Sequence, residues 1–399
     1  PLVTGPFGSS IGRRFFVPSG VPVIRGNNLS TSRVRFIDDG FVFLTEEKAE
    51  EFKNLEARPG DLIFTAAGTI GQVGIIPPHP RYPRYIISNK QMRARLDTSK
   101  IDPLFAYYWF TEPEMRAYIE SMNTGSTIPL INLSVLRSLP IPLPPLQVQR
   151  QIVSLLDALD ARIQHLRSYC ATLDGLAQTV FKSWFIDFAP VRAKAEGRDP
   201  EYLDAGTAAL FPTEFDMSEI GPIPRGWRVQ TLGDVFDLNP RRDLPRGADA
   251  TYLDMQGTPT VGHRPLSLRR REFGSGVKFT NGDTLLARIT PCLENGKTAF
   301  VDFLEDGEVG WGSTEFVVLR PKPPLPPFFG YLLARDHRFR AYAIRSMSGS
   351  SGRQRVDVGS LAQYRFAVPD TPVAEAFGRL VEPLRARVAA NCQMQGTLA

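Results

Sequence analysis

The most constraining feature of this sequence is an internal repeat with a nearly constant offset. "PGDLIFTAAGTIGQVG" (Pro59–Gly74) lines up with "NGDTLLARITPCLENG" (Asn281–Gly296), because each is a Gly-Asp turn that enters a short β-rich run. "LRSLPIPLP" (Leu136–Pro144) likewise aligns with "LAQYRFAVPD" (Leu361–Asp370). The offsets of 222 and 225 residues indicate that one unit of about that length is used twice.

Each copy consists of a globular block followed by a helix. Short runs of Val, Ile, Phe and Tyr broken by Gly and Pro indicate strands, while 103–122 and 327–347 have the pattern of amphipathic helices. We therefore predict an α+β fold in which two globular domains are separated by long helices that form an antiparallel coiled coil, with a pseudo-two-fold internal repeat. The predicted segments are a first globular domain (1–142), a central helical spacer (143–212), a second globular domain (213–370) and a distal helical region (371–399).

The spacer helix is predicted from "PLPPLQVQRQIVSLLDALDARI". Pro144 and Pro145 end one element and are favoured in the first turn of the next. From there apolar residues recur at steps of four and three, which is the pattern of a coiled-coil seam. A helix from about Leu146 to Phe185 would be ~60 Å long at ~1.5 Å per residue. The predicted seam consists of Ile152, Leu156, Leu159, Ile163, Leu166, Cys170, Leu173, Ala177, Val180 and Trp184.

The second copy of the helix supplies a partner for this seam. Phe377, Val381, Leu384, Val388, Asn391, Gln395 and Leu398 step in the same way, and Asn391 in such a seam would set the register. Pro383 is expected to kink this helix or to shorten it to a start near Pro383. Because "GWRVQTLGDVFDL" (226–238) and "FKSWFIDF" (181–188) each lack a counterpart in the other copy, we expect the chain to be truncated at both ends.

Composition narrows the class of protein. Hydrophobic residues make up 42% and charged residues 22% of the 399 residues, and no apolar run approaches the roughly 18 to 20 residues needed to span a membrane. The three cysteines are far apart in sequence and form no CxxC pair, so neither a disulfide framework nor a zinc site is expected. Since no export signal is visible either, we expect a protein of the cytoplasm.

Arginine clusters suggest nucleic-acid contacts, since Arg suits phosphate and guanine edges and Asn or Gln can read adenine. A solvated basic face is the alternative reading of the net charge of +5, and a third to a half of the candidates are expected to be surface or structural residues. In the first domain the candidates are Arg13, Arg14, Arg25, Asn27, Asn28, Lys90, Gln91 and Arg93. In the second they are Arg241, Arg242, Arg264, Arg269, Arg270, Arg271, Arg353, Gln354 and Arg355.

Motifs with catalytic meaning are weak. "DPLF" (Asp102–Phe105) lacks the second proline of a methyltransferase motif. "GTIGQVG" (68–74) has the pattern of tight turns between strands, and a backbone approach to DNA phosphate is the alternative. The four histidines form no metal-ligand pair. We therefore predict no catalytic residue and no metal site in this chain.

Three motifs together resemble the specificity (S) subunit of type I restriction-modification systems. They are "IPLPPLQVQRQI" with "LLDALDARI", then "FKSWFIDFAPVRAKAEGR", and "IGPIPRGWRVQTLGDV". The usual glutamate of the "PPLxEQ" segment is Val148 here, although Gln149 is kept, and the second copy "DTPVAEAF" has lost most of the motif. These departures weaken the expectation of partner docking at the second helix.

The resemblance implies a non-catalytic subunit whose two domains are target recognition domains, each reading one half of a split, asymmetric sequence in double-stranded DNA. The helices would act as a ruler and dock methyltransferase (modification) subunits, with Phe181 and Phe185 as candidate contacts; burial of these rings is an equally good reading. ATP-dependent restriction subunits would be further partners, and S-adenosylmethionine and ATP would be bound by partners rather than here. Two alternatives are the recognition portion of a single-chain restriction-methylation enzyme and a repeat scaffold without a DNA role. An insertion of four residues near Leu166 would test the ruler.

Overall fold

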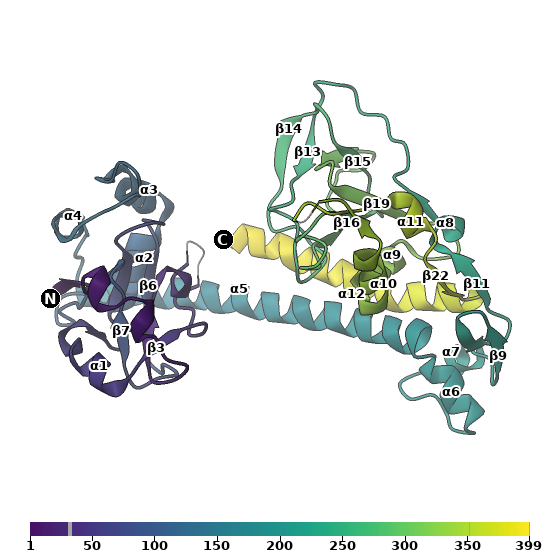
Figure 1. Ribbon diagram of the computed structural model, residues 1–399, viewed down its shortest axis with the longest axis horizontal. Helices are drawn as coiled ribbons and strands as arrows, with labels where there is room; N and C mark the ends of the chain where they lie inside the picture. Colours follow the sequence, from purple (N-terminus) through teal and green to yellow (C-terminus); the bar gives the residue numbers. More distant parts are fainter. Residues whose placement is uncertain (31–33, 351, 399) are drawn as a thin grey trace. The chain divides into compact units, whose positions relative to one another are not determined.

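The chain forms two compact units in a computed structural model that describes residues 1–30, 34–350 and 352–398 (Figure 1). Unit 1 comprises Pro1–Arg162, and unit 2 comprises Ile163–Ala399. Helix α5 (Leu146–Phe181) begins in unit 1 and ends in unit 2. The boundary therefore lies inside the predicted spacer region (143–212), and the four predicted segment boundaries stay a prediction.

Unit 1 contains two four-stranded sheets within its described residues. The first sheet is antiparallel throughout, with the strand order β1 (Leu2–Thr4), β8 (Gln91–Ala94), β5 (Leu62–Thr65) and β6 (Val73–Ile75). The second sheet has the order β3 (Val42–Leu44), β2 (Val21–Ile24), β7 (Tyr85–Ile87) and β4 (Glu56–Ala57). In this second sheet β2 and β7 run parallel, and the other neighbours are antiparallel. Every residue of β2, β5, β6, β7 and β8 is buried, as expected for short strands with continuous apolar runs.

The helices of unit 1 begin at residues that cap them. The Asp102 carboxylate accepts hydrogen bonds from the backbone N–H groups of Leu104 and Phe105, and Pro103 occupies the first turn of α2. The Glu112 side chain caps the following helix in the same way. The helices before α5 are α1 (Glu46–Glu50), α2 (Pro103–Thr111), α3 (Pro113–Ser121) and α4 (Leu133–Ser138).

Unit 2 repeats the sheets of unit 1 strand for strand. Its antiparallel sheet has the order β12 (Phe236–Leu238), β19 (Phe316–Pro321), β16 (Thr284–Ala287) and β17 (Thr298–Phe300). Its mixed sheet has the order β14 (Arg269–Glu272), β13 (Asp249–Leu253), β18 (Gly310–Gly312) and β15 (Val277–Phe279). The parallel pair, β13 with β18, occupies the same place as β2 with β7. The predicted α+β fold and its internal repeat are therefore confirmed.

The remaining elements of unit 2 surround these sheets. Three two-stranded ladders pair β9 with β10, β11 with β22, and β20 with β21. Their bounds are β9 (Phe215–Ser218), β10 (Gly221–Pro224), β11 (Arg228–Thr231), β22 (Arg365–Val368), β20 (Met347–Ser348) and β21 (Arg355–Val356). The helices are α6 (Ala189–Ala195), α7 (Ala205–Ala209), α8 (Leu232–Val235), α9 (Pro327–Arg335), α10 (His337–Arg345), α11 (Val358–Ala362) and α12 (Thr371–Leu398).

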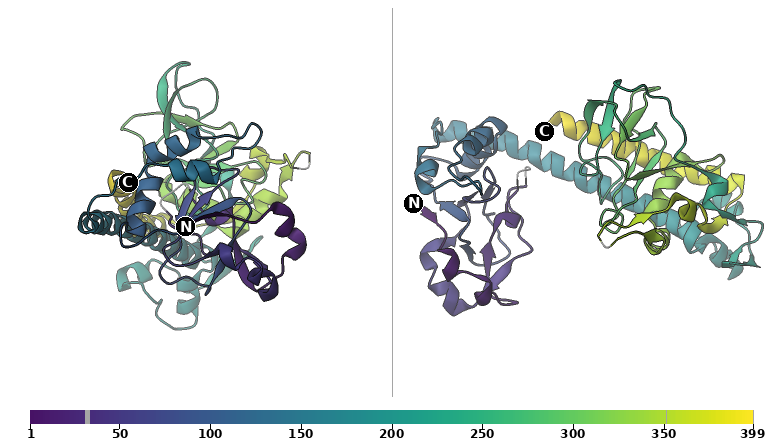
Figure 2. Two further views of the ribbon diagram at one scale, coloured as in Figure 1. Left: turned by 90° about the vertical axis from the view of Figure 1, so that its left-hand side faces the viewer. Right: turned by 45° about the horizontal axis from the view of Figure 1, so that its top comes forward.

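Within unit 2, α12 packs antiparallel on the C-terminal part of α5, and the two helices lie side by side in Figures 1 and 2. Cys170 and Leu173 of α5 pack with Val388, while the ring of Phe181, near the end of α5, lies 6.2 Å from that of Phe377, near the start of α12. Ile163, Leu166, Ala177 and Trp184 are buried as well. The predicted antiparallel coiled coil is therefore confirmed here, with Val180 and Leu384 partly buried at its margin.

The seam predicted for the first turns of α5 is wrong by one residue. Ile152 is 38% exposed, and its neighbour Val153 lies in the core of unit 1. Leu156 and Leu159 are only partly buried, whereas Gln149 and Asp160 are buried. The polar residues Gln149 and Asp160 occupy inward positions because unit 1 offers them hydrogen-bond partners, and an apolar pattern cannot reveal such positions.

Pro383 does not shorten α12, so this one of the two predicted effects is wrong, and the predicted kink stays a prediction. The helix runs from Thr371 to Leu398 with Pro383 inside it. Pro383 and Arg379 are both exposed, so the carbonyl group of Arg379, which loses its helical donor to the proline ring, lies on the solvent side of the helix. Among the described residues, none of the helices is both long enough and apolar enough to cross a membrane.

Candidate nucleic-acid interface

Strand β14 carries three consecutive arginines at the edge of the mixed sheet of unit 2. All four of its residues, Arg269–Glu272, are exposed. Because side chains alternate between the two faces of a strand, Arg269 and Arg271 share one face and Arg270 lies on the other. β14 pairs with β13, so that Tyr252 is opposite Arg269. The run of three arginines therefore divides between two surfaces.

Arg271 is held over two aromatic rings. Its guanidinium carbon lies 4.8 Å from the centroid of the Tyr252 ring and 5.8 Å from that of Trp311, and the two rings are 4.4 Å apart. Trp311 is buried, and its indole N–H donates a hydrogen bond of 3.2 Å to the backbone carbonyl of Arg271. Since ring faces attract cations, this stacking fixes the direction of the guanidinium group without neutralising its charge.

Lys278 and Arg269 extend the same face. Lys278 is paired in register with Trp311, and its ammonium nitrogen lies 4.8 Å from the Phe273 ring. Arg269 has a carboxylate partner, Asp254, only at 4.0 Å. Among the residues that the structure describes, neither Arg271 nor Lys278 has an ion-pair partner. Arg269, Arg271 and Lys278 therefore lie on one face of the mixed sheet and make that face basic.

Arg270 is neutralised by acidic partners. Its Nε donates a hydrogen bond of 2.7 Å to Asp249, and its Nη1 lies 3.3 Å from Glu308. The hydrogen bond and the charge of Asp249 raise the pKa of Arg270 above its ordinary value. Arg270 thus ties β14 to β13 and to the turn before β18.

The other candidates in unit 2 fall into two groups. Arg241 and Arg353 are exposed, and within the described ranges neither has an ion-pair partner; the backbone of Gln354 bonds to Thr290. Three others form ion pairs within the chain, of which that of Arg355 lies at the surface. Their pairs are Arg242 with the buried Asp283, Arg264 with Asp302, and Arg355 with both carboxylate oxygens of Glu315.

In unit 1 the exposed candidates are Arg13, Arg14, Asn27 and Lys90. Arg14 donates to the carbonyl of Ser9 and lies over the Phe15 ring at 4.7 Å, and Asn27 donates to the carbonyl of Gly40. Arg25 is partly buried. The structure leaves these side chains accessible, and their contact with DNA stays a prediction.

The predicted DNA contacts of Asn28, Gln91 and Arg93 are corrected, because all three side chains are buried. The Asn28 amide donates to the carbonyls of Ile37 and Asp39 and so shapes the segment after β2. Gln91 bonds to the Ser88 hydroxyl, and Arg93 donates to the carbonyl of Glu56. Burial and the nearby charge of Arg95 lower the pKa of Arg93. In sequence these polar residues look like surface residues, and only their internal partners distinguish them.

A buried charged cluster in unit 2 was not predicted. The His263 Nδ1 lies 2.8 Å from Asp174 Oδ1, and the Nε2 lies 3.4 Å from Asp302 Oδ2 without the orientation of a hydrogen bond. Asp302 also pairs with Arg264 and with Arg385 of α12. Burial alone would raise the pKa of Asp302, but His263 and Arg264 lower it to about 2. The cluster ties the segment after β13 to both long helices.

An equivalent cluster lies in unit 1, with different residues. Arg35, in the segment after β2, pairs with Asp157 of α5 and lies 3.6 Å from Asp160. The Tyr108 hydroxyl donates a hydrogen bond of 2.8 Å to Asp160. The segment after β2 in unit 1 and the segment after β13 in unit 2 are thus each fixed to a long helix by an ion pair. The cation is Arg35 in unit 1 and His263 in unit 2. No repeated residue in the sequence marks this relationship.

Phe181 and Phe185 belong to the core of unit 2, which corrects their prediction as contacts of a partner subunit. Their side chains are only 2% and 5% exposed. The ring of Phe185 lies 4.7 Å from that of Phe377 and 5.2 Å from that of Phe329. The alternative reading, burial of both rings, is the one that the structure supports. The helix changes to a π turn over Lys182–Ile186, which turns Trp184 and Phe185 inward.

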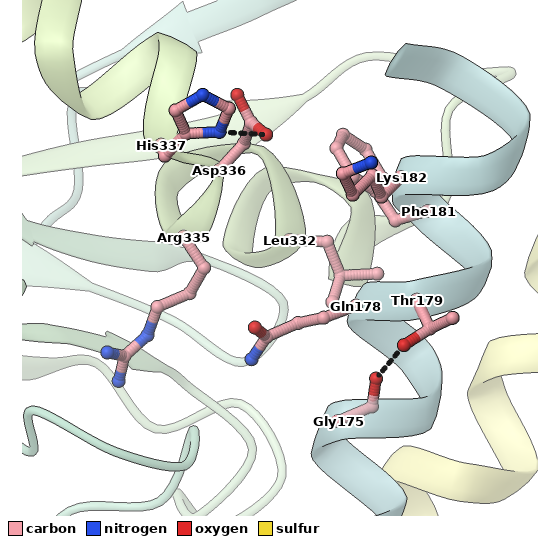
Figure 3. A pocket seen from close by; sticks show the side chains of 9 residues that line it. All are labelled: Gly175, Gln178, Thr179, Phe181, Lys182, Leu332, Arg335, Asp336 and His337. Carbon is pink, nitrogen blue, oxygen red and sulfur yellow. Dashed lines mark hydrogen bonds and ion pairs between the residues drawn. The ribbon is translucent and has the colours of Figure 1, made fainter. Parts of the chain in front are cut away.

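A pocket beside α5 shows no convergent catalytic groups (Figure 3). It lies between the end of α5 and the junction of α9 with α10. The Thr179 hydroxyl bonds back to the Gly175 carbonyl, and Arg335 donates to the carbonyls of Gly262 and Gly296. In Figure 3 the charged ends of Arg335 and Lys182 point in different directions. Thr179 and Arg335 are thus bonded to backbone carbonyls rather than directed together into the pocket.

Asp102, the first residue of the weak catalytic motif "DPLF", makes structural contacts. Its carboxylate caps α2, and its backbone N–H donates to Gln149. Over residues 1–30, 34–350 and 352–398, no group of three or more potential metal ligands comes together.

Comparisons with known proteins identify the first repeat. Residues 17–168 match the family model described as type I restriction modification DNA specificity domain. The MjaIX specificity subunit of a type I restriction enzyme from Methanocaldococcus jannaschii is 26% identical over 226 residues, which cover 57% of this chain and 47% of that protein. The HindI specificity subunit from Haemophilus influenzae is 28% identical over 255 residues, which cover 51% of this chain and 55% of that protein. The chain spans about half the length of these curated relatives.

The fold is likewise found among solved structures. The S subunit of a type I restriction-modification system from M. genitalium superposes with a TM-score of 0.52 at 14% identity, covering 100% of this chain and 90% of that one. This likeness concerns the fold alone. Residues 17–168 match the model of the type I restriction modification DNA specificity domain, and the resemblance of the chain to specificity subunits of type I restriction-modification systems is confirmed.

Proposed function

We propose that this chain is a non-catalytic subunit that recognises DNA sequence for a type I restriction-modification enzyme. Each unit reads one half of a bipartite, asymmetric target in double-stranded DNA. The family match of residues 17–168 and the specificity subunits among the relatives support this proposal. The single-chain restriction-methylation alternative is not favoured, because the relatives are named as specificity subunits.

The observation that carries the proposal is that units 1 and 2 have the same sheets but different side chains at equivalent strands. The strand orders of units 1 and 2 are the same, yet the edge strand β3 reads Val42–Leu44 and its equivalent β14 reads Arg269–Glu272. A shared framework that presents different side chains at equivalent places suits the reading of two unlike half-sites. Sequence is read through side chains at base edges, whereas the framework only positions them.

The long helices are proposed to set the spacing of the half-sites and to bind the methyltransferase subunits. α5 presents an exposed apolar row in unit 1, in which Val148 is 40%, Ile152 38% and Leu155 64% exposed. These positions are spaced by four and three, so they form one face that another amphipathic helix can cover. This row replaces Phe181 and Phe185 as the proposed docking surface. The ATP-dependent restriction subunits join the assembly through those partners.

Catalysis is assigned to the partner subunits. S-adenosylmethionine and ATP are bound there, and this chain supplies target choice. The assembly acts on DNA in the cytoplasm. This division of labour is a proposal that rests on the resemblance to specificity subunits.

Sequencing of modified bases in single DNA molecules tests the proposal. The chain is expressed with its neighbouring methyltransferase gene in a host that lacks other modification systems. We expect a split asymmetric motif that is methylated once on each strand and is lost when the chain is deleted. A short undivided motif, or methylation that does not depend on this chain, would refute the proposal.

A further inference from the structure

We infer that Arg271 reads a base in the half-site of unit 2, while Arg269 and Lys278 contact the neighbouring phosphates. This inference rests on the proposed function and assigns it to a particular surface. β14 and β13 form a two-stranded antiparallel ribbon at the edge of their sheet and lie side by side in Figure 1. The major groove of B-DNA admits such a ribbon.

The environment of Arg271 suits base reading. A bidentate contact to the two acceptors of guanine is favoured when the plane of the guanidinium is already fixed, because less side-chain freedom is lost on binding. The rings of Tyr252 and Trp311 supply that fixation, and Trp311 is itself anchored to the Arg271 carbonyl. Because no carboxylate among the described residues pairs with Arg271, its donors are available to a ligand.

The environments of Arg269 and Lys278 suit phosphate contacts. Arg269 is exposed with one carboxylate at the limiting distance of 4.0 Å, and Lys278 carries a point charge beside Phe273. Neither is held in one orientation by a strong partner. Contacts of this kind position a protein on the duplex and add affinity that depends on salt, without selecting a sequence.

Protection of the sheet edge is the competing explanation for the arginines of β14. Exposed edge strands carry charges that prevent pairing with other chains. Any charged residue would serve that purpose, and it would not require Arg271 to be stacked over two rings. The chain also contains its own control, because Arg270 has the same charge, lies on the same strand and is neutralised by Asp249 and Glu308.

The test compares Arg271→Lys, Arg269→Gln, Lys278→Gln and the control Arg270→Gln in the full chain. Each variant is expressed with the methyltransferase partner, its methylated motif is sequenced, and its binding to the wild-type target duplex and to an unrelated duplex is measured against salt. We expect Arg271→Lys to relax one guanine position of one half-site by about 10-fold or more. Arg269→Gln and Lys278→Gln should keep the motif, weaken binding to all sequences alike, and each reduce the salt slope by about one. Arg270→Gln should change neither the methylated motif nor the dependence of binding on salt.

The outcomes separate the inference from the proposed function. If the wild-type chain gives no split motif, the proposed function is refuted. A normal wild-type motif that Arg271→Lys leaves unchanged overturns the inference alone. Normal motif and binding of all variants together with self-association of Arg269→Gln, which removes a charge, measured by light scattering, would assign β14 to edge protection and also overturn it. Thermal unfolding of each variant checks that it is folded.

Discussion

His263 and Asp174 form a buried pair at 2.8 Å between Nδ1 and Oδ1, and this pair joins the segment after β13 to α5. The His263 side chain is fully buried, with Asp302 on its other side. Burial alone would lower the pKa of the imidazole, but Asp174 and Asp302 raise the pKa above its ordinary value of 6.5. The charged imidazolium is therefore the form that this site stabilises.

His263 should make the stability of unit 2 depend on pH. Since its pKa is higher in the folded chain, its contribution is fully present below about pH 6.5 and is lost as the pH rises through the folded pKa. Asp302 acts in the opposite direction, because its contribution is lost as the pH falls from about 4 to about 2. We expect urea unfolding of unit 2 to show a decline above neutral pH that His263→Gln removes.

The control for this prediction is His337→Gln, since His337 is an exposed histidine on the same unit. It should leave the pH profile of unfolding unchanged. An identical decline in the His263→Gln variant would show that another group titrates. A loss of stability in His263→Gln is expected in addition below the folded pKa, because two buried carboxylates then lack their shared cation.

Gln149 should be required for the stability of unit 1. Its side chain accepts a hydrogen bond from Asp102 N–H at 2.8 Å and donates to the carbonyls of Lys100 and Pro144 at 3.0 and 2.7 Å. Gln149→Ala removes three hydrogen bonds to partly buried backbone groups, and each such bond contributes about 0.5–1.5 kcal/mol. We expect a loss of about 2–3 kcal/mol in the free energy of unfolding of unit 1, measured by hydrogen exchange.

The matched control for this change is Gln147→Ala, because Gln147 is exposed and lies two residues before Gln149 on the same helix. It should change the free energy of unfolding by less than about 0.5 kcal/mol. Equal effects of the two substitutions would show that helix propensity, and not the three hydrogen bonds, governs the result. In the second repeat Ala374 stands at the place of Gln149, so this tie is peculiar to unit 1.

The sequence allowed the repeat, the α+β class and the helix pair to be predicted, because these depend on apolar spacing and turn residues. It could not supply the inward position of polar side chains such as Gln149 and Arg93, whose partners are backbone carbonyls far away in sequence. The sequence also could not show which arginines of β14 lie on the same face of the sheet, since this depends on where the strand begins and on its pairing with β13. Charge clusters such as that of His263 arise from tertiary contacts that no local pattern records.

The exposed apolar row of α5 should be needed for binding of the methyltransferase and not for folding. Replacing Ile152 and Leu155 by Lys places two charges on this face, where they would be buried unpaired on docking of an apolar helix. We expect binding, measured by co-purification of the two subunits, to be lost while the thermal unfolding temperature is kept. Val153→Ser, which lies one residue away in the core of unit 1, should instead lower that temperature. Unchanged co-purification of the Lys variant would contradict the proposed docking surface.

The length of α5 should set the gap between the two half-sites of the DNA target. Leu166 is buried in unit 2, so an insertion there would disrupt packing, whereas an insertion after the exposed Arg162 falls at the boundary of the units. Four added helical residues lengthen α5 by about 6 Å, which corresponds to about two base pairs. Modified-base sequencing should then report the same two half-sites with a longer gap. The same insertion after Gly197, an exposed turn residue, should leave the gap unchanged because it does not alter α5. If both insertions gave the wild-type gap, α5 would not be the ruler, and the spacing would have to come from the partner subunits.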